Sequence, residues 1–406
     1  MKLQKPIIYS LILLTSAISC RKQGSYDPVS DSGTNHAIIN IENPTVKSYL
    51  DILQMQPYRD GDYSYSVIDD YYAVTTKYRK DHPAPATISW NRDERSLSQK
   101  VYVSEDPSFA SPRVYPVKNS LSSFDIYNAV PGHEYYWKVT ARLDDDSQMQ
   151  LANGSFSAVG RRCFLNISNV CNVRDLGGIP AREGSCRIKY GMLFRSGEMD
   201  GGHKDLDDNY CHIDADGIVD LTRAGVKAVL DLRTDSEAHN VKSSPLGDDV
   251  TYVRFGNANA YMYDKFWTSD VYIRAVQWMI DALKQGRPVI FHCIYGADRT
   301  GTLAFIVEAL LGVDQNQLAI DYEMTSFSYG LDSYPRRRGP KNPLSVYRYR
   351  NMVETILSDS DLFRGATLQK KIYNFLSKGY PSNPSFSYKI PSSDLDWFIE
   401  NLLEEK

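Results

Sequence analysis

The sequence predicts a multidomain protein in which a β-sandwich is followed by an α/β domain with a mainly parallel central sheet flanked by helices. Between residues 83 and 158, short runs of alternating apolar and polar residues are separated by turn signals, which is typical of an antiparallel sandwich. From about residue 163, strand-like apolar runs alternate with helical patterns, which is typical of a parallel sheet covered by helices. The length of 406 residues also exceeds that of one average domain.

The overall composition is that of a globular protein. Apolar residues make up 42% of the chain and charged residues 24%, and both fractions are ordinary. The net charge is −4 at pH 7. A general nucleic-acid-binding protein needs an excess of positive charge, so we expect no nucleic-acid partner.

Residues 1–20 have the pattern of a secretory signal. Two lysines precede an apolar segment, residues 7–14, that is too short to remain as a membrane span. Small residues follow and end at Cys20, which resembles the cleavage and lipidation site of bacterial lipoproteins. The resemblance implies a protein held by a lipid on Cys20 at the bacterial cell envelope, in the periplasm or on the outer-membrane surface. Ala17 stands where that family usually has Leu, so ordinary signal-peptide cleavage is the alternative.

The N-terminal half contains one module with a readable pattern. Residues 21–36 predict a flexible tether, and residues 37–82 have no clear structure. The module at 83–158 has expected strands at 87–90, 99–103, 123–127 and 134–140. Trp90 and the stretch AVPGHEYYWKVTAR resemble a fibronectin type III module. The resemblance implies core aromatics and a spacer or docking role, with a ligand platform as the alternative and no identifiable protein partner.

The α/β domain is predicted to extend over residues 163–406. A helix at 216–224 leads into a strand at 227–232, and a second helix spans 269–285. A strand at 288–291 then precedes a helix that begins near residue 299. Residues 314–406 are predicted to be largely helical, with an interruption at 334–350.

The chain is organised around the stretch PVIFHCIYGADRTG at residues 288–301. A buried strand, a short loop beginning at Cys293 and a helix N-terminus form a cradle in which backbone N–H groups converge on an anion. The helix dipole and these N–H groups favour a thiolate, so Cys293 is the candidate nucleophile. Arg299, six positions later, can return its guanidinium to the loop and hold two phosphate oxygens. Gly296 and Gly301 allow the backbone to approach the ligand.

The segment HCIYGADRTG resembles the H-C-x-x-G-x-x-R-[ST] signature of cysteine-dependent tyrosine and dual-specificity phosphatases. Three further blocks precede it in matching order: NVRDLGG, GMLFRSGE and GVKAVLDLRTDSE. Together they resemble the bacterial tyrosine phosphatase branch, which includes phosphoinositide phosphatases. The resemblance covers roughly residues 163–330. It implies hydrolysis of a phosphate monoester through a cysteinyl-phosphate intermediate, without a metal or cofactor.

The resemblance also implies a role for each residue of the loop. Cys293 attacks phosphorus, while Arg299 and the backbone N–H groups hold the equatorial oxygens. Thr300 hydrogen-bonds the departing sulfur, and His292 orients the loop and favours the thiolate. The substrate-binding positions are Ile294, Tyr295, Gly296, Ala297 and Gly301.

Three aspartates are candidates for the general acid that protonates the leaving oxygen. Asp298 lies within the loop, where the bacterial branch often has Asp, and is the first choice. Asp264 lies 29 residues before Cys293, a separation that resembles that of the movable-loop Asp in other tyrosine phosphatases, and it is the alternative. Asp231 is the third, although in the sequence DLR it is better suited to anchor Arg233 or the loop.

Two features bear on the substrate. Branch members with inositol-lipid activity often carry Lys just before the loop Asp, and here that position is Ala297, which argues against polyphosphorylated substrates. The segment 334–350 is rich in cations and has no acid, which predicts a lid that attracts acidic ligands or, equally, a solvated or membrane-facing loop. The predicted lid residues are Arg336, Arg337, Arg338 and Lys341.

The predicted substrate is phosphotyrosine or a similar aryl phosphate. The alternatives are inositol phosphates, phosphoinositides or sugar phosphates, and, in another class, a surface binding protein with an inactive phosphatase fold. An extracytoplasmic location permits disulfides, and three full pairings of the four remaining cysteines are open. None of them has convincing metal-ligand spacing. These cysteines are Cys163, Cys171, Cys186 and Cys211.

Overall fold

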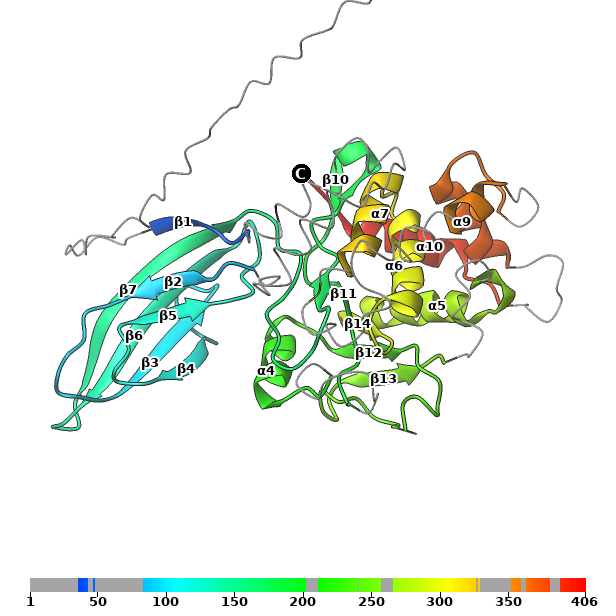
Figure 1. Ribbon diagram of the computed structural model, residues 1–406. Helices are drawn as coiled ribbons and strands as arrows, with labels where there is room; N and C mark the ends of the chain where they lie inside the picture. Colours follow the sequence, from blue (N-terminus) through cyan, green and yellow to red (C-terminus); the bar gives the residue numbers. More distant parts are fainter. Residues whose placement is uncertain are drawn as a thin grey trace, which may run out of the picture.

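The computed structural model describes residues 36–42, 47, 83–201, 211–239, 241–256, 266–325, 328, 352–358, 363–379 and 388–406. Strands β1 to β7 form an elongated N-terminal unit, and the later elements form an α/β unit beside it (Figure 1). Within the described ranges, no helix is both long and apolar enough to cross a membrane.

The N-terminal unit contains two sheets. The larger sheet has the order β1-β7-β6-β3-β4, and the smaller one pairs β2 with β5. Both contribute to one apolar cluster, to which Ile88 and Ile126 come from the smaller sheet and Val101 and Val139 from the larger. The strands are β1 His36–Asn40, β2 Ala86–Ser89, β3 Ser96–Ser104, β4 Arg113–Val117, β5 Ser123–Ile126, β6 Glu134–Leu143 and β7 Gln148–Val159.

The expected strands of this unit are all present, but its predicted start at residue 83 is wrong. Strand β1 pairs in parallel with β7 and extends the larger sheet at its edge. Its side chains are exposed or half-buried, so it is held mainly by backbone hydrogen bonds and carries little sequence signal. Its first residue, His36, falls within the predicted tether. Relation to fibronectin type III modules stays a prediction.

The aromatic residues that suggested the module lie in its core. Trp90 is buried, and its Nε1 donates to Gln99 Oε1 at 2.8 Å. Tyr135 is also buried and stacks on Phe156, with ring centroids 5.1 Å apart. Packing therefore accounts for these rings better than a ligand platform does.

The α/β unit is built on a five-stranded sheet of order β13-β12-β14-β11-β8. All pairings are parallel except that of β8 with β11, so the prediction of a mainly parallel sheet is confirmed. Strands β11, β12 and β14 are buried at every residue, as expected for a sheet covered on both faces. The bounds are β8 Arg174–Asp175, β11 Leu193–Ser196, β12 Ala228–Asp231, β13 Thr251–Arg254 and β14 Val289–His292.

A small antiparallel sheet, β15-β10-β9, joins the end of the described chain to the start of this unit. Its strands are β9 Pro180–Ala181, β10 Cys186–Ile188 and β15 Leu403–Glu405, and a 3-10 helix, η1 Arg182–Gly184, connects the first two. A second 3-10 helix, η4 Phe266–Thr268, precedes α5. The sheet ties residues 403–405 to the same core as the catalytic loop.

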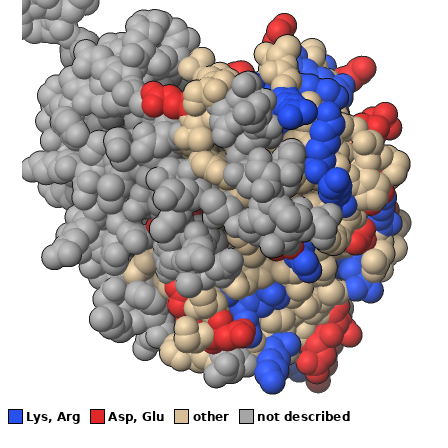
Figure 2. Space-filling view, turned by 90° about the vertical axis from the view of Figure 1, so that its right-hand side faces the viewer, with Lys and Arg blue, Asp and Glu red and all other residues tan. Residues whose placement is uncertain are grey.

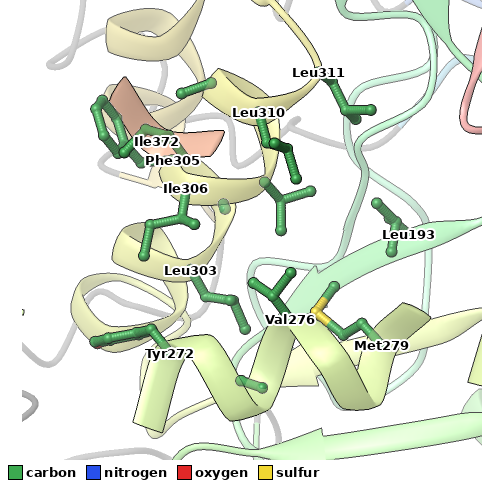
Figure 3. Packing of buried hydrophobic residues seen from close by; sticks show 14 of the residues in the cluster. Leu193, Tyr272, Val276, Met279, Leu303, Phe305, Ile306, Leu310, Leu311 and Ile372 are labelled. Carbon is green, nitrogen blue, oxygen red and sulfur yellow. The ribbon is translucent and has the colours of Figure 1, made fainter. Parts of the chain in front are cut away.

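Helices cover both faces of the five-stranded sheet. Helix α4 packs through Leu221 against Val229 and Ile290 on one face. On the other face, α5 and α6 pack together and against Leu193 of β11 (Figure 3). The described helices are α4 Ala215–Arg223, α5 Val271–Lys284, α6 Asp298–Leu310, α7 Gln315–Met324, a helical segment at 352–358, α9 Leu368–Lys378 and α10 Ser392–Asn401.

Helix α6 is the centre of this unit. Each of its residues is buried, and Figure 3 shows Leu303 and Leu310 on the side of α6 that faces Val276 and Met279 of α5 and Leu193. Full burial of each such side chain stabilises the fold by about 1.5–3 kcal/mol. The N-terminus of α6, next to Cys293, is therefore held in place by the core.

The described surface carries charges of both signs. Figure 2 shows Lys and Arg side chains next to Asp and Glu side chains on the face it presents. Ion pairs of the described residues include Lys284 with Asp394 at 2.7 Å and Arg274 with Asp270 at 2.6 Å. Exposed pairs of this kind contribute about 0–1 kcal/mol each.

The cysteine pairings proposed from the sequence are not formed. Among the described residues, Cys163, Cys171, Cys186 and Cys211 take part in no disulfide.

Candidate active site

The predicted catalytic loop lies where a central strand meets a central helix. Strand β14, flanked by β12 and β11, ends at His292, and α6 begins at Asp298. Cys293 follows the strand directly and is 3% exposed. The loop thus occupies the carboxyl edge of parallel strands, the usual place for ligand sites in α/β sheets.

Gly296 is required by the shape of the loop. Its φ is +66°, and a Cβ at this position would lie 2.4 Å from the carbonyl oxygen of Ser196. The Gly296 carbonyl accepts hydrogen bonds from Arg195 Nη2 at 2.7 Å and from Asn172 Nδ2 at 3.1 Å. Asn172 Nδ2 also donates to the carbonyl of Tyr295 at 3.1 Å. Asn172 and Arg195, which come from distant segments of the chain, therefore hold the backbone of the loop in place.

These supports belong to a buried ionic network. Arg195 forms a salt bridge with Asp321, and Arg174 donates to the backbone carbonyl of Asp321 at 2.7 Å. Arg174 also donates to Thr325 Oγ1 at 2.9 Å. Burial opposes ionisation of Asp321, but Arg174 and Arg195 outweigh it and lower the pKa of this carboxyl. The negative charge of Asp321 thereby holds both arginines in the core.

Arg299 is oriented by a glutamate and a backbone carbonyl. Its Nη1 donates to Leu232 O at 2.9 Å and to Glu237 Oε2 at 2.7 Å, and its Nη2 donates to Glu237 Oε1 at 3.1 Å. Glu237 in turn accepts from the backbone N–H of Thr234 at 2.7 Å. The DLRTDSE block therefore sets the plane of the Arg299 guanidinium.

His292 and Asp231 lie side by side under the loop. His292 is fully buried, its Nδ1 is 3.1 Å from the Cys293 carbonyl oxygen, and its Nε2 is 4.0 Å from Asp231 Oδ1. Burial lowers the pKa of His292, while the neighbouring charge of Asp231 acts in the opposite direction. Burial also opposes ionisation of Asp231, but His292 and Arg233 lower its pKa to about 2.

Asp231 anchors Arg233, which is the role that the sequence favoured for it over that of the general acid. It accepts from Arg233 and from Tyr252 Oη, the latter at 2.8 Å. Arg233 also binds Glu198 at 3.0 Å and Asp200 at 2.7 Å. The backbone N–H of Glu198 donates to the carbonyl of Ile294 at 2.9 Å, so this second ionic cluster also supports the loop.

Residues 298–301 form the first turn of α6. Asp298 is 6% exposed, and a carboxylate at this position favours a helix N-terminus. Thr300 is fully buried, and within the described residues its Oγ1 has no hydrogen-bond partner. Its bond to the departing sulfur stays a prediction. The interpretation of Gly301 needs correction. A Cβ there would lie 2.7 Å from the Tyr322 ring, so packing of α7 on α6 requires this glycine.

The side chains of Ile294 and Tyr295 are buried in the protein interior. Both are buried in a small cluster with Cys171 and Cys211, and Ala297 packs against it. These loop positions can therefore serve a substrate only through their backbone. Burial raises the pKa of the Cys171 thiol, which makes it a poor nucleophile.

Some predicted functional residues lie outside the described residues. They are the alternative acid Asp264, the lid residues Arg336, Arg337, Arg338 and Lys341, and the lipidation site Cys20.

The sequence interpretation missed several residues that the structure brings to the loop. Asn172, Arg174 and Arg195 stand in blocks that were recognised but given no roles, and Glu237 closes a third block. An arginine directly after two apolar residues of a predicted strand was the available signal for Arg195, because a buried cation requires a partner.

The site thus combines a buried cysteine between a parallel strand and a helix N-terminus with an arginine fixed six residues later. Residues 165–355 match the model of the tyrosine phosphatase family. This part of the chain is therefore similar to the tyrosine phosphatase family.

Two curated proteins that the chain resembles also carry phosphatase names. A Cupriavidus necator protein provisionally named a tyrosine-protein phosphatase is 29% identical over 177 residues, which cover 41% of this chain and 64% of that protein. The triple specificity protein phosphatase PtpB of Mycobacterium tuberculosis is 34% identical over 95 residues, which cover 23% of this chain and 33% of PtpB. The chain thus spans less than two thirds of either relative.

Similar solved structures include TpbA of P. aeruginosa and the catalytic core of the PP-IP phosphatase SIW14 of S. cerevisiae. TpbA is 16% identical with a TM-score of 0.26, covering 42% of this chain and 90% of TpbA. SIW14 is 16% identical with a TM-score of 0.25, covering 42% of this chain and 86% of that one. TM-scores this low do not show that the whole chain has the same fold as either structure.

Proposed function

We propose that the protein hydrolyses phosphate monoesters through a cysteinyl-phosphate intermediate and that its first substrate class is phosphotyrosine or similar aryl phosphates. The observation that carries this proposal is the position of Cys293 at the base of a loop whose carbonyls and arginine are held by buried partners. A rigid cradle is what electrostatic stabilisation of a phosphoryl transition state requires.

In the first step, the Cys293 thiolate attacks phosphorus and the bond from phosphorus to the leaving oxygen breaks. Arg299 and the N–H groups at the start of α6 hold the equatorial oxygens. Asp298 donates a proton to the leaving oxygen, which departs as an alcohol or phenol. Asp264 is the alternative donor.

In the second step, water attacks phosphorus and the bond to sulfur breaks. The deprotonated acid takes a proton from this water, which yields inorganic phosphate and regenerates the thiolate. Thr300 hydrogen-bonds the departing sulfur. Its buried Oγ1 has no competing partner in the described part of the chain, which supports this role.

The decisive experiment measures hydrolysis of p-nitrophenyl phosphate by the full chain with a metal chelator present. We expect activity in the wild type, none in Cys293→Ser, and full activity in the matched control Cys186→Ser. Cys186 is a suitable control because it lies in β10 of the three-stranded sheet β15-β10-β9, outside the five-stranded sheet that carries the catalytic loop. Turnover that survives Cys293→Ser, or that the chelator abolishes, would refute the proposal.

A substrate panel then tests the substrate class. We expect phosphotyrosine peptides to be hydrolysed with a higher kcat/KM than inositol phosphates, phosphoinositides or sugar phosphates. The absence of a cation at Ala297 supports this order. A preference for polyphosphorylated inositols would reverse it and establish the alternative. If no ester is hydrolysed, the protein is a binding protein with an inactive phosphatase fold.

We also propose that Arg336, Arg337 and Arg338 form a lid for acidic substrates, because this segment combines several cations with no acid. Replacing all three by Gln should raise KM for phosphopeptides and leave KM for p-nitrophenyl phosphate nearly unchanged. Unchanged kinetics with both substrates would remove the lid from the mechanism.

We propose finally that the enzyme is anchored at the bacterial cell envelope by a lipid on Cys20, with the N-terminal unit as a spacer. The support is the pattern of residues 1–20. Cells that express the chain with labelled palmitate should yield a labelled protein, and Cys20→Ala should abolish the label. A labelled Cys20→Ala protein or an unlabelled wild type would exclude lipidation at this residue.

A further inference from the structure

A polar cavity lies between the N-terminal unit and the α/β unit. Its volume is about 200 Å³, and its walls come from the β3 to β6 region, from α4 and from the segment before β11. Figure 1 shows α4 beside this part of the sandwich. None of the residues that line it belongs to the catalytic loop, so it is separate from the site described above.

Two arginines in the wall, Arg113 and Arg223, form no direct salt bridge with a carboxylate among the described residues. The Arg223 guanidinium lies 4.5 Å from the centroid of the Tyr115 ring, and Arg113 Nη2 donates to the Arg223 carbonyl oxygen at 3.3 Å. Asp220, which also lines the cavity, attracts both guanidinium groups without a direct salt bridge. The third arginine of the wall, Arg162, does form one, with Asp175. The cavity therefore offers two guanidinium groups whose remaining N–H donors an anion could engage.

The other walls offer hydrogen-bond acceptors and flat apolar surface. Asp220 lies on α4 and Glu105 lies across the cavity, where it is 3.0 Å from His133 Nδ1. The rings of Tyr115, Tyr127 and Tyr190 also line the cavity. Carboxylates accept hydrogen bonds from hydroxyl groups, and aromatic rings pack against the apolar faces of a small ring compound.

We propose that this cavity binds a small hydroxylated organic anion of the size of a sugar acid, with its anionic group between Arg113 and Arg223. Its hydroxyl groups would donate to Asp220 and Glu105, and its body would lie against the tyrosine rings. The volume is below the range of about 300–1,000 Å³ for drug-sized ligands, which limits the occupant to about one sugar ring.

Such a ligand would contact both units at once. The cavity wall already connects them, because Arg162 Nη1 donates to the carbonyl of Asn128 at 2.8 Å and Asn128 Nδ2 donates to the carbonyl of Asn166 at 2.9 Å. Binding should therefore fix the sandwich on the phosphatase domain without touching the catalytic loop.

Calorimetric titration of the full chain with D-glucuronate tests the proposal, because this probe is a hydroxylated anion without a phosphate ester. We expect saturable binding that Arg113→Gln and Arg223→Gln each weaken about tenfold or more, the usual effect of losing a charge-assisted hydrogen bond. D-glucose, which has the hydroxyl groups but no charge, should bind at least about tenfold more weakly.

Two control variants locate the site. Arg142→Gln removes an exposed arginine of β6, and Arg299→Gln removes the arginine of the catalytic loop. Both should bind D-glucuronate as the wild type does. Absence of saturable binding, unchanged affinity in Arg113→Gln and Arg223→Gln, or loss of binding in Arg299→Gln alone would overturn the proposal. The last result would place the anion in the catalytic loop.

Discussion

Glu237 holds the phosphate-binding arginine of the catalytic loop by a bidentate contact, with its two oxygens 2.7 and 3.1 Å from Arg299 Nη1 and Nη2. Glu237 is 62 residues away in sequence and follows strand β12. The guanidinium plane is thus set by the protein before a substrate arrives, which lowers the cost of organising the transition state.

We predict that Glu237→Gln lowers kcat/KM for aryl phosphates about tenfold or more, because an amide cannot hold both guanidinium nitrogens as a carboxylate does. Steady-state kinetics with p-nitrophenyl phosphate would measure this change. Asp235→Asn is the matched control, since Asp235 is 80% exposed and pairs with Arg254 instead. A Glu237→Gln enzyme with wild-type kcat/KM would show that Arg299 needs no such support.

Asn172 combines a backbone and a side-chain role, and two substitutions separate them. Its φ is +55° and its amide donates to two loop carbonyls. Asn172→Gly keeps the backbone conformation but removes the amide, so we predict a kcat/KM about tenfold lower and a loss of about 1–2 kcal/mol in the free energy of unfolding.

Asn172→Ala should cost about 1 kcal/mol more in unfolding, because a Cβ is strained at positive φ. Denaturant unfolding and steady-state kinetics on both variants would check this pair. Equal stability of the Gly and Ala variants would refute the claim that residue 172 needs a positive φ. An unaltered kcat/KM in Asn172→Gly would refute the claim that the Asn172 amide supports the catalytic loop.

The sequence predicted the centre of the site well because its signals are local. Strand β14 and helix α6 begin within one residue of their expected positions, since four consecutive buried residues and a helix start adjoin the motif. The need for a glycine at 296 was also anticipated, and the structure adds that this residue lies against the backbone of Ser196 in β11.

The supports of the loop could not be predicted because they depend on how distant strands pair. Arg174 and Arg195 lie directly opposite each other in the antiparallel pair of β8 and β11, and their shared partner Asp321 comes from α7. Strand β1 was missed for a similar reason, since its only strong contact is the backbone ladder to β7. Such pairings carry no local pattern in a single sequence.

The two candidate acids can be distinguished by the leaving group. A poor leaving group needs the proton more than a good one does. If Asp298 is the donor, Asp298→Asn should lower kcat for phenyl phosphate about a hundredfold and affect p-nitrophenyl phosphate much less. Asp264→Asn should then behave as the wild type. Kinetics of both variants with both esters would decide, and the reverse pattern would assign the acid to Asp264.

Glu308 should make stability depend on pH. It lies on α6, fully buried, where burial and the negative charge of Asp321 raise its pKa well above the ordinary value of 4.5. A carboxyl with a raised folded pKa contributes its stability below pH 4.5 and loses it as the pH rises through the folded value. Glu308→Gln resembles the protonated form at every pH.

We therefore predict that the free energy of unfolding falls with rising pH above 4.5 in the wild type and falls less steeply in Glu308→Gln. Glu308→Ala should lose about 2 kcal/mol near pH 5, because it leaves a cavity and removes the neighbour of Asp321. Urea unfolding at a series of pH values would measure all three proteins, with Glu400→Gln on the exposed side of α10 as the control. Parallel pH profiles for the wild type and Glu308→Gln would mean that Glu308 is ionised in the folded protein. A further cation, besides Arg174 and Arg195, would then have to stabilise the carboxylates of Glu308 and Asp321.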